Sequence, residues 1–164
     1  MSFAGKSTVA QGLAPLIPAE VVSLDSINAE RGLVGGDGIP VEEWIATNGI
    51  ARERVSKLLA SGASTIVDDT TSLRMLRDGW RSLASEHGAR TALVWVQIDA
   101  GLQRERLLAN RLTGMRDDVI DEVITQHVAS FESPASDELP LILVAGESRN
   151  PERIAALVAA ILEG

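Results

Sequence analysis

Cysteine is absent from this sequence of 164 residues, and aromatic residues make up only 3% of it. Without cysteine the chain forms no disulfide and performs no thiol chemistry, which fits a reducing compartment. Its apolar runs fall well short of the roughly 18 residues that a membrane-spanning helix needs, and its first residues lack the pattern of a secretory signal. We therefore expect a soluble protein of the cytoplasm.

Positive charge is also scarce. Lysine and arginine together number 15 against 23 aspartate and glutamate residues, which gives a formal net charge of −8. This balance disfavours broad contact with nucleic acid or an anionic membrane, because both call for a basic face, although a local basic site remains compatible with it. Lysine is the rarer cation, since only Lys6 and Lys57 are present.

Short apolar runs alternate with longer helical patterns, which is typical of an α/β fold with a parallel sheet flanked by helices. No repeat or linker divides the chain, so we expect a single domain over residues 1–164. We predict strands at residues 21–24, 64–68, 92–98 and 141–144. We interpret the helical stripes of residues 73–83, 120–131 and 154–162 as core.

The run AGKST at residues 4–8 matches the second half of the phosphate-binding pattern GxxxxGK[ST]. In that pattern Gly5 would let the backbone close on phosphates, Lys6 would reach the β- and γ-phosphates, and the Ser7 hydroxyl would ligate Mg²⁺. The first glycine of the pattern would precede Met1, and so would the strand before it. The alternative interpretation is an ordinary helix start.

Acidic residues follow two of the predicted strands. Asp25 ends the first, where a carboxylate can accept a proton from a substrate hydroxyl, although it could instead cap the next helix. Asp68 ends the second, where a carboxylate can hold Mg²⁺ or its waters. We interpret the adjacent Asp69 as a solvated residue near a helix start.

Arginine residues gather in a segment of residues 104–118, around Gly114. Arg106 and Arg111 straddle a helix end that leads into this flexible point, an arrangement by which a mobile lid delivers cations to a transferring phosphoryl group. The alternative is a solvated face, in which these arginines pair with nearby acids such as Asp118.

Together these motifs, with the later run SFESPASDE, resemble the small P-loop kinases. That group includes predicted bacterial AAA-type kinases, polynucleotide 5′-hydroxyl kinases, zeta toxins and chloramphenicol phosphotransferase. The resemblance implies the P-loop NTPase fold of nucleoside monophosphate kinases, with a five-stranded parallel sheet, and it implies ATP and Mg²⁺ as cofactors.

The resemblance also assigns roles to residues. It implies that Asp25, Lys6, Arg111 and Arg106 act in catalysis and that Ser7 and Asp68 hold the metal. It implies nucleotide binding by a larger set, comprising the opening loop, the lid and the loop where adenine is commonly held: Ala4, Gly5, Lys6, Ser7, Thr8, Arg116 and Arg149.

The sequence departs from the family pattern at three places. Many members carry an arginine where Asn28 stands, and the DxT motif of residues 68–70 is followed by Thr71 in place of the usual asparagine. The first strand of these folds is central to the sheet, and its loss would open a gap between neighbouring strands. We expect that the natural protein begins further upstream, or that swapping, dimerisation or a different sheet closure repairs the gap.

The function that these features predict is transfer of the γ-phosphoryl group of ATP to a hydroxyl of a small molecule. One alternative is a nucleotide-binding or degenerate P-loop domain without catalysis. Another is a polynucleotide 5′-hydroxyl kinase, which the acidic composition disfavours. We interpret Trp44 as a core residue and His127 as a buried residue whose polar atoms are satisfied.

Overall fold

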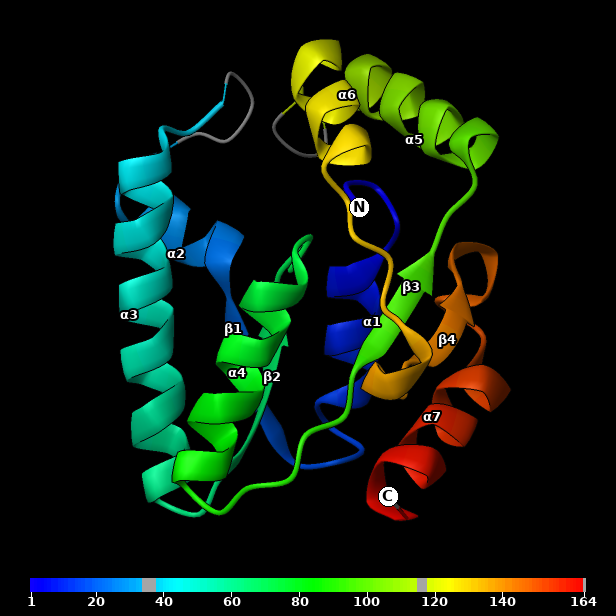
Figure 1. The fold of residues 1–164 in the computed structure, drawn as a ribbon. Coiled ribbons are helices and arrows are strands. Elements are labelled where there is room, and N and C mark those ends of the chain that lie inside the picture. The colour runs from blue at the N-terminus through cyan, green and yellow to red at the C-terminus, as the bar shows by residue number, and fades with distance from the viewer. Residues whose placement is uncertain (34–37, 115–117, 164) are drawn as a thin grey trace.

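The computed structural model describes residues 1–33, 38–114 and 118–163 (Figure 1). Helices and strands alternate along the chain, as the sequence predicts. In order they are α1 Lys6–Leu13, β1 Ala19–Ser23, α2 Leu24–Glu30, α3 Val41–Ala60, β2 Ser64–Asp68, α4 Arg74–Glu86, β3 Val94–Gln97, α5 Ala100–Thr113, α6 Asp121–Ala129, β4 Leu141–Val144 and α7 Pro151–Glu163, with short 3₁₀ helices η2 Ser136–Glu138 and η3 Ala145–Glu147 on either side of β4. Within these ranges no helix has the length and apolarity needed to cross a bilayer.

The sheet consists of two separate parallel pairs. Strand β1 pairs with β2 in a register that sets Ala19 opposite Ser64, and β3 pairs with β4 in a register that sets Val94 opposite Leu141. Among the described residues no strand joins β2 to β3, so the predicted gap is confirmed. Figure 1 shows the two pairs apart, with α1 near the gap.

Two apolar cores follow this division. The first, which we assign to the β3–β4 half, joins α1, β3, β4 and α7 through Val9, Leu13, Val96, Leu143, Ile154 and Leu157, with Leu102 of α5 packed against it. The second, which we assign to the β1–β2 half, joins β1, α2, α3 and α4 through Val22, Leu24, Ile27, Ala51, Val55 and Leu83. Each half therefore buries most of its own apolar side chains, although Ile66 of β2 packs against the first core.

A buried ion pair connects the halves beside the gap. The guanidinium of Arg77 on α4 donates from Nε to Oε2 of Glu138 at 2.7 Å and from Nη2 to Oε1 at 2.8 Å. Both side chains are almost fully buried, with 3% and 1% of their surfaces exposed. Arg81 donates to the same carboxylate at 2.8 Å, and the backbone of Glu132 donates to Ser72 O at 2.9 Å. Hydrogen bonds and ion pairs thus connect the two halves beside the gap, where an additional strand would otherwise connect β2 to β3.

The prediction that residues 120–131 form a core stripe is wrong. Helix α6 has no buried residue, because it lies across the top of the molecule, above the amino terminus, and not against either sheet (Figure 1). Its Val123 and His127 side chains line a cleft instead.

Candidate active site

The opening loop turns sharply into α1 at Gly5. This residue has the left-handed backbone angle φ of 95°, and a Cβ atom placed there would lie 3.2 Å from Ser148 Oγ. Glycine is therefore favoured both by the backbone angle and by the close neighbour. Within the described residues, α1 has no side-chain cap and no acid in its first turn. Its first amide groups, at the positive end of the helix, are available to an anion.

Arg106, on α5, binds the main chain of this loop. Its Nη1 donates to the carbonyls of Phe3 at 3.0 Å and Ala4 at 3.2 Å, and its Nη2 donates to the carbonyl of Ala145 at 2.9 Å. Residues 104–113 belong to α5, from which Leu102 packs on the β3–β4 half, and the role of this segment as a lid stays a prediction. The structure places Arg106 against the phosphate loop and not over the cleft.

The predicted acids line a cleft of about 1360 Å³ that the opening loop also lines. Asp25 is exposed in the first turn of α2, and Asp68 ends β2. The cap of α2 is Ser23, whose side chain accepts from Ser26 N at 3.3 Å, so capping does not explain Asp25. Both acids line the same cleft as the predicted loop residues Gly5, Lys6, Ser7 and Thr8, whereas Ala4 is fully buried behind it.

Asp69 occupies a more enclosed position than our interpretation of it as a solvated residue allowed, and that interpretation is wrong. Burial raises the pKa of its carboxyl, against the opposing effect of hydrogen bonds from the backbone of Thr70 and Thr71 and of the charge of Lys6. Asp69 therefore lies within electrostatic reach of the predicted phosphate-binding lysine. The only sequence signal for an enclosed loop at this point was the run of two acids followed by two hydroxyl residues at positions 68–71.

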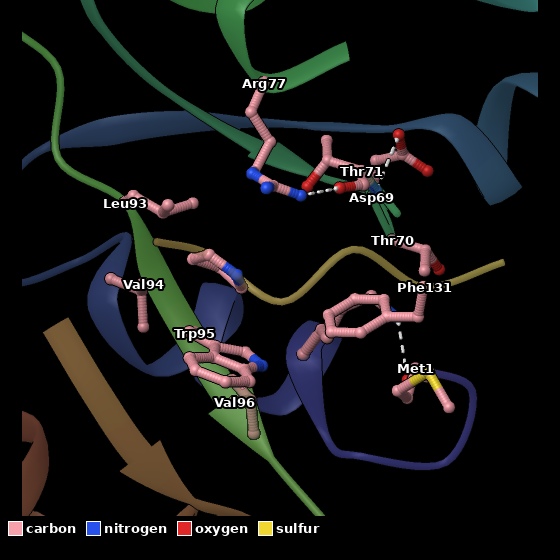
Figure 2. Close-up of a pocket in the computed structure, with 12 residues that line it drawn as sticks. Met1, Asp69, Thr70, Thr71, Arg77, Leu93, Val94, Trp95, Val96 and Phe131 are labelled. Carbon is pink, nitrogen blue, oxygen red and sulfur yellow. Dashed lines mark hydrogen bonds between the residues drawn. The ribbon is translucent and has the colours of Figure 1, made fainter. Parts of the chain in front are cut away.

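The loop after β2 is held in an unusual shape. Thr71 has a positive φ of 39°, a region that β-branched residues rarely adopt. Figure 2 shows Arg77 reaching the carbonyl of Thr71, where its Nη1 donates at 3.0 Å. Thr71 and Arg77 line a small cavity of about 40 Å³. Lys6, Asp69 and Trp95 line it as well. The buried ion pair thus also shapes the loop that carries Asp69.

Lys6 points toward the loop that precedes it. Its Nζ donates to Met1 O at 3.4 Å. Burial, with a smaller contribution from the charge of Lys6, lowers the pKa of the Met1 amino group to about 5. The side chain of Lys6 thus contacts the opening loop and lies within electrostatic reach of Asp69.

Of the predicted lid residues, Arg111 forms ion pairs. Arg111 donates to Asp118 at 3.0 Å and to Asp121 at 2.7 Å, the solvated arrangement that the sequence left open. Arg116 lies outside the described residues. Arg149 is exposed after η3, next to Ser148, which approaches Gly5.

His127 faces the cleft from α6. Its Nδ1 is buried with no hydrogen-bond partner among the described residues, so the interpretation of a satisfied histidine is wrong. Burial lowers the pKa of His127, and the nearby Met1 amino group and Lys6 lower it further. The neutral ring therefore adds an uncharged polar group to the lining of the cleft on the side of α6.

Two oxygen-bearing residues of this cleft fit magnesium. In the described part of the chain no three histidine, aspartate or glutamate side chains gather into a complete metal site. Ser7 and Asp68 nevertheless line the same cleft and offer one hydroxyl and one carboxylate. Mg²⁺ commonly takes one or two protein oxygens and completes its shell with water and substrate phosphates.

Parallel strands flanked by helices, with a glycine turn at the start of α1 and acids at the strand ends, define the fold of the small P-loop kinases. The chain belongs to the AAA domain family, whose model matches residues 1–134. No curated protein matches the sequence.

Solved structures share this fold at low sequence identity. A sugar kinase from Janibacter sp. HTCC2649 is 18% identical, with 99% of this chain and 90% of that chain covered and a TM-score of 0.68. A gluconokinase from Sinorhizobium meliloti 1021 is 16% identical, with 97% and 87% covered and a TM-score of 0.66. The Mycobacterium tuberculosis APS kinase, solved with AMPPNP and APS, is 18% identical, with 100% and 94% covered and a TM-score of 0.62.

Proposed function

We propose that this chain transfers the γ-phosphoryl group of ATP to a hydroxyl group of a small molecule. The observation that carries the proposal is the placement of Gly5, Lys6 and Ser7, at the start of α1, on the same cleft as Asp25 and Asp68. A polyphosphate on one side of such a cleft faces a proton acceptor on the other. The kinases with this fold are consistent with the proposal.

The residues divide the work as follows. The first amides of α1 and the Lys6 ammonium bind the β- and γ-phosphates, while Ser7 and Asp68 would hold Mg²⁺, which would supply charge neutralisation at the phosphate oxygens. Asp25 accepts the proton of the acceptor hydroxyl as its oxygen bonds to the γ-phosphorus, and the bond from that phosphorus to ADP breaks. Arg111 serves as the lid cation once it leaves Asp118 and Asp121.

Two substitutions test this division. Lys6→Ala removes a phosphate contact, so we expect both Mg-ATP binding, measured by calorimetry, and turnover to be lost. Asp25→Asn keeps the binding surface and removes the proton acceptor, so we expect Mg-ATP to bind normally while turnover falls about 10²- to 10⁴-fold. Unchanged turnover in both variants would refute the proposed mechanism.

Matched controls are available for each change. Lys57→Ala removes the other lysine, which is exposed on α3 and pairs with Glu53. Glu30→Gln removes an exposed acid at the end of α2, which pairs with Arg54. We expect both controls to bind and turn over Mg-ATP as the parent does.

The split between β2 and β3 favours one rival, a nucleotide-binding domain without catalysis. Its signature is Mg-ATP binding that Lys6→Ala abolishes, combined with the absence of turnover for every acceptor offered.

A further inference from the structure

The side of the cleft opposite the phosphate loop is mainly apolar. It is formed by one face of α3 and one face of α4, where side chains one helical turn apart point the same way. These side chains are Val41, Trp44 and Ile45 on α3, and Met75, Leu76 and Trp80 on α4. Val41, Ile45 and Met75 are 64%, 66% and 72% exposed, so they are not occupied by the core and remain open to a ligand.

The cations on this side are already engaged. Arg52 donates to Gly79 O at 3.0 Å, and its guanidinium carbon lies 5.6 Å from the centre of the Trp80 ring. Arg31, the arginine nearest to the position where related kinases carry one, pairs with Glu43 and donates to Thr47 at 2.7 Å. Among the described residues that line the cleft, Arg52 is the only arginine, and it is held against α4, whereas Arg31 does not line the cleft.

Acids dominate the charge of the cleft. Its described lining contains four aspartates, Asp25, Asp68, Asp69 and Asp118, against Lys6 and Arg52. Lys6 is assigned to the phosphates of the nucleotide, and Arg52 is held by α4. A carboxylate, sulfate or phosphate on the acceptor would meet repulsion from Asp25, the group that must receive the hydroxyl proton.

We infer that the acceptor is an uncharged alcohol with a flat apolar body, which lies along the exposed apolar side chains of α3 and α4 and presents its hydroxyl to Asp25. The inference rests on the proposed phosphotransfer and names its substrate class. Apolar and aromatic walls with few polar groups are what small-molecule sites commonly offer to such a body, whereas a polyol or a nucleic-acid end requires hydrogen-bonding or basic partners. Transfer then proceeds as above, with the acceptor oxygen bonded to phosphorus, its proton on Asp25 and ADP as the leaving group.

The test compares probes that differ in one property. The diol 3-phenoxypropane-1,2-diol carries a neutral aromatic body, glycerol lacks that body, gluconate adds a carboxylate, and a 5′-hydroxyl oligothymidylate represents nucleic acid. Binding is followed by tryptophan fluorescence in a Trp95→Phe background, which leaves Trp44 and Trp80, both on the cleft. We expect the aromatic diol to bind at least 10-fold more tightly than glycerol or gluconate and to be the probe that stimulates ADP release from Mg-ATP.

Two exposed residues provide the site-specific variants. Ile45→Ser and Met75→Ser remove apolar surface from the cleft without opening a core, so we expect the dissociation constant and KM for the aromatic diol to rise about 5-fold or more, with little change in kcat. Leu112→Ser is the matched control, because Leu112 is 89% exposed on α5 and does not line the cleft.

The outcomes separate this inference from the proposed function. Turnover with gluconate or the oligonucleotide in preference to the aromatic diol would overturn the inference and leave the kinase intact. Aromatic binding that depends on Ile45 and Met75 in a protein without any turnover would overturn the kinase and support the apolar site. Self-association that Ile45→Ser abolishes, measured by sedimentation, would show that a second copy covers the surface and would also overturn the inference.

Discussion

The two halves of the molecule use their residues differently. In the β3–β4 half, the opening loop is fixed largely through backbone carbonyls, which Arg106 and Gln103 bind from α5. In the β1–β2 half, the strand ends and helices present side chains to the cleft, both acids and exposed apolar groups. Under the proposed function, one half would therefore supply a shaped backbone for phosphates, and the other would supply the side chains that select the acceptor.

The junction between the halves is polar, whereas each core is apolar. Two acids near it experience opposite environments: Arg77 and Arg81 hold the pKa of Glu138 far below its ordinary value, while burial raises that of Asp69. The junction thus contains one acid that favours the folded state when ionised and one that opposes it. The predictions below test this contrast, from the largest expected effect to the smallest.

Glu138→Gln should give the largest loss of stability. It leaves Arg77 buried without its counter-charge, which typically costs about 3–5 kcal/mol, and urea unfolding would measure it. Because the pKa of Glu138 is depressed on folding, its contribution is present at neutral pH and is lost as the pH falls below about 4.5, the ordinary value. In the Glu138→Gln variant, the free energy of unfolding should therefore fall less steeply below about pH 4.5 than it does in the parent.

Asp137→Asn is the control for that change, since Asp137 forms an exposed pair with Arg74 on the same two segments. It should unfold almost as the parent does. The double variant Arg77→Met with Glu138→Leu should recover much of the lost stability. A Glu138→Gln protein as stable as the parent would show that the polar junction does not join the halves.

Gly5→Ala should have the next largest effect. A left-handed backbone costs a residue with a Cβ atom about 1–2 kcal/mol, and here that atom would also press on Ser148 Oγ. We expect lower stability together with weaker Mg-ATP binding by calorimetry. Gly32→Ala, with φ of 73° and no atom within 4 Å of the added Cβ, should lose stability alone. Equal Mg-ATP binding by both variants would contradict the assignment of the loop.

Asp69→Asn should stabilise the protein at neutral pH. A carboxyl whose pKa is raised on folding favours the folded state below its ordinary pKa of 3.8, and this contribution is lost as the pH rises through the higher folded value. Thermal unfolding across pH 3–8 would show the parent losing this contribution and the variant not. A destabilised variant would indicate that the ionised carboxylate is a favourable partner of Lys6.

His127→Gln should change stability least, by less than about 0.5 kcal/mol at pH 7. Because folding lowers the pKa of His127 from 6.5, the folded protein resists its protonation, and stability falls as the pH drops below about 6.5. In the variant, the unfolding temperature should no longer fall between about pH 6.5 and 5. An unchanged pH dependence would show that other groups cause it.

Much of the fold was predictable because it follows from local apolar patterns. The predicted bounds of β2 and β4 match the structure, since β2 carries the β-branched residues Thr65, Ile66 and Val67 and β4 is the apolar run Leu141–Val144. The first strand was placed at residues 21–24 but spans Ala19–Ser23, because pairing with β2 extends it backwards and Leu24 begins α2. The break between β2 and β3 was predictable from the family pattern of the strands.

The positions that depend on distant contacts were not predictable. Helix α6 has an apolar stripe like that of a core helix, but nothing in the stripe reveals that the helix spans the cleft. Arg106 has the sequence neighbours of a lid residue, and two of its three partners lie about a hundred residues earlier in the chain. Likewise, the enclosure of Asp69 requires Arg77 and residues 131–138 to close around its loop.

The bonds from Arg106 to three main-chain carbonyls have a thermodynamic consequence for nucleotide binding. They fix the loop before any ligand arrives, so the conformational entropy of its residues is already lost on folding. Association with a polyphosphate would then require little ordering of the backbone, and an Arg106→Lys protein, which keeps the charge but cannot span all three oxygens, should bind Mg-ATP with a more unfavourable entropy.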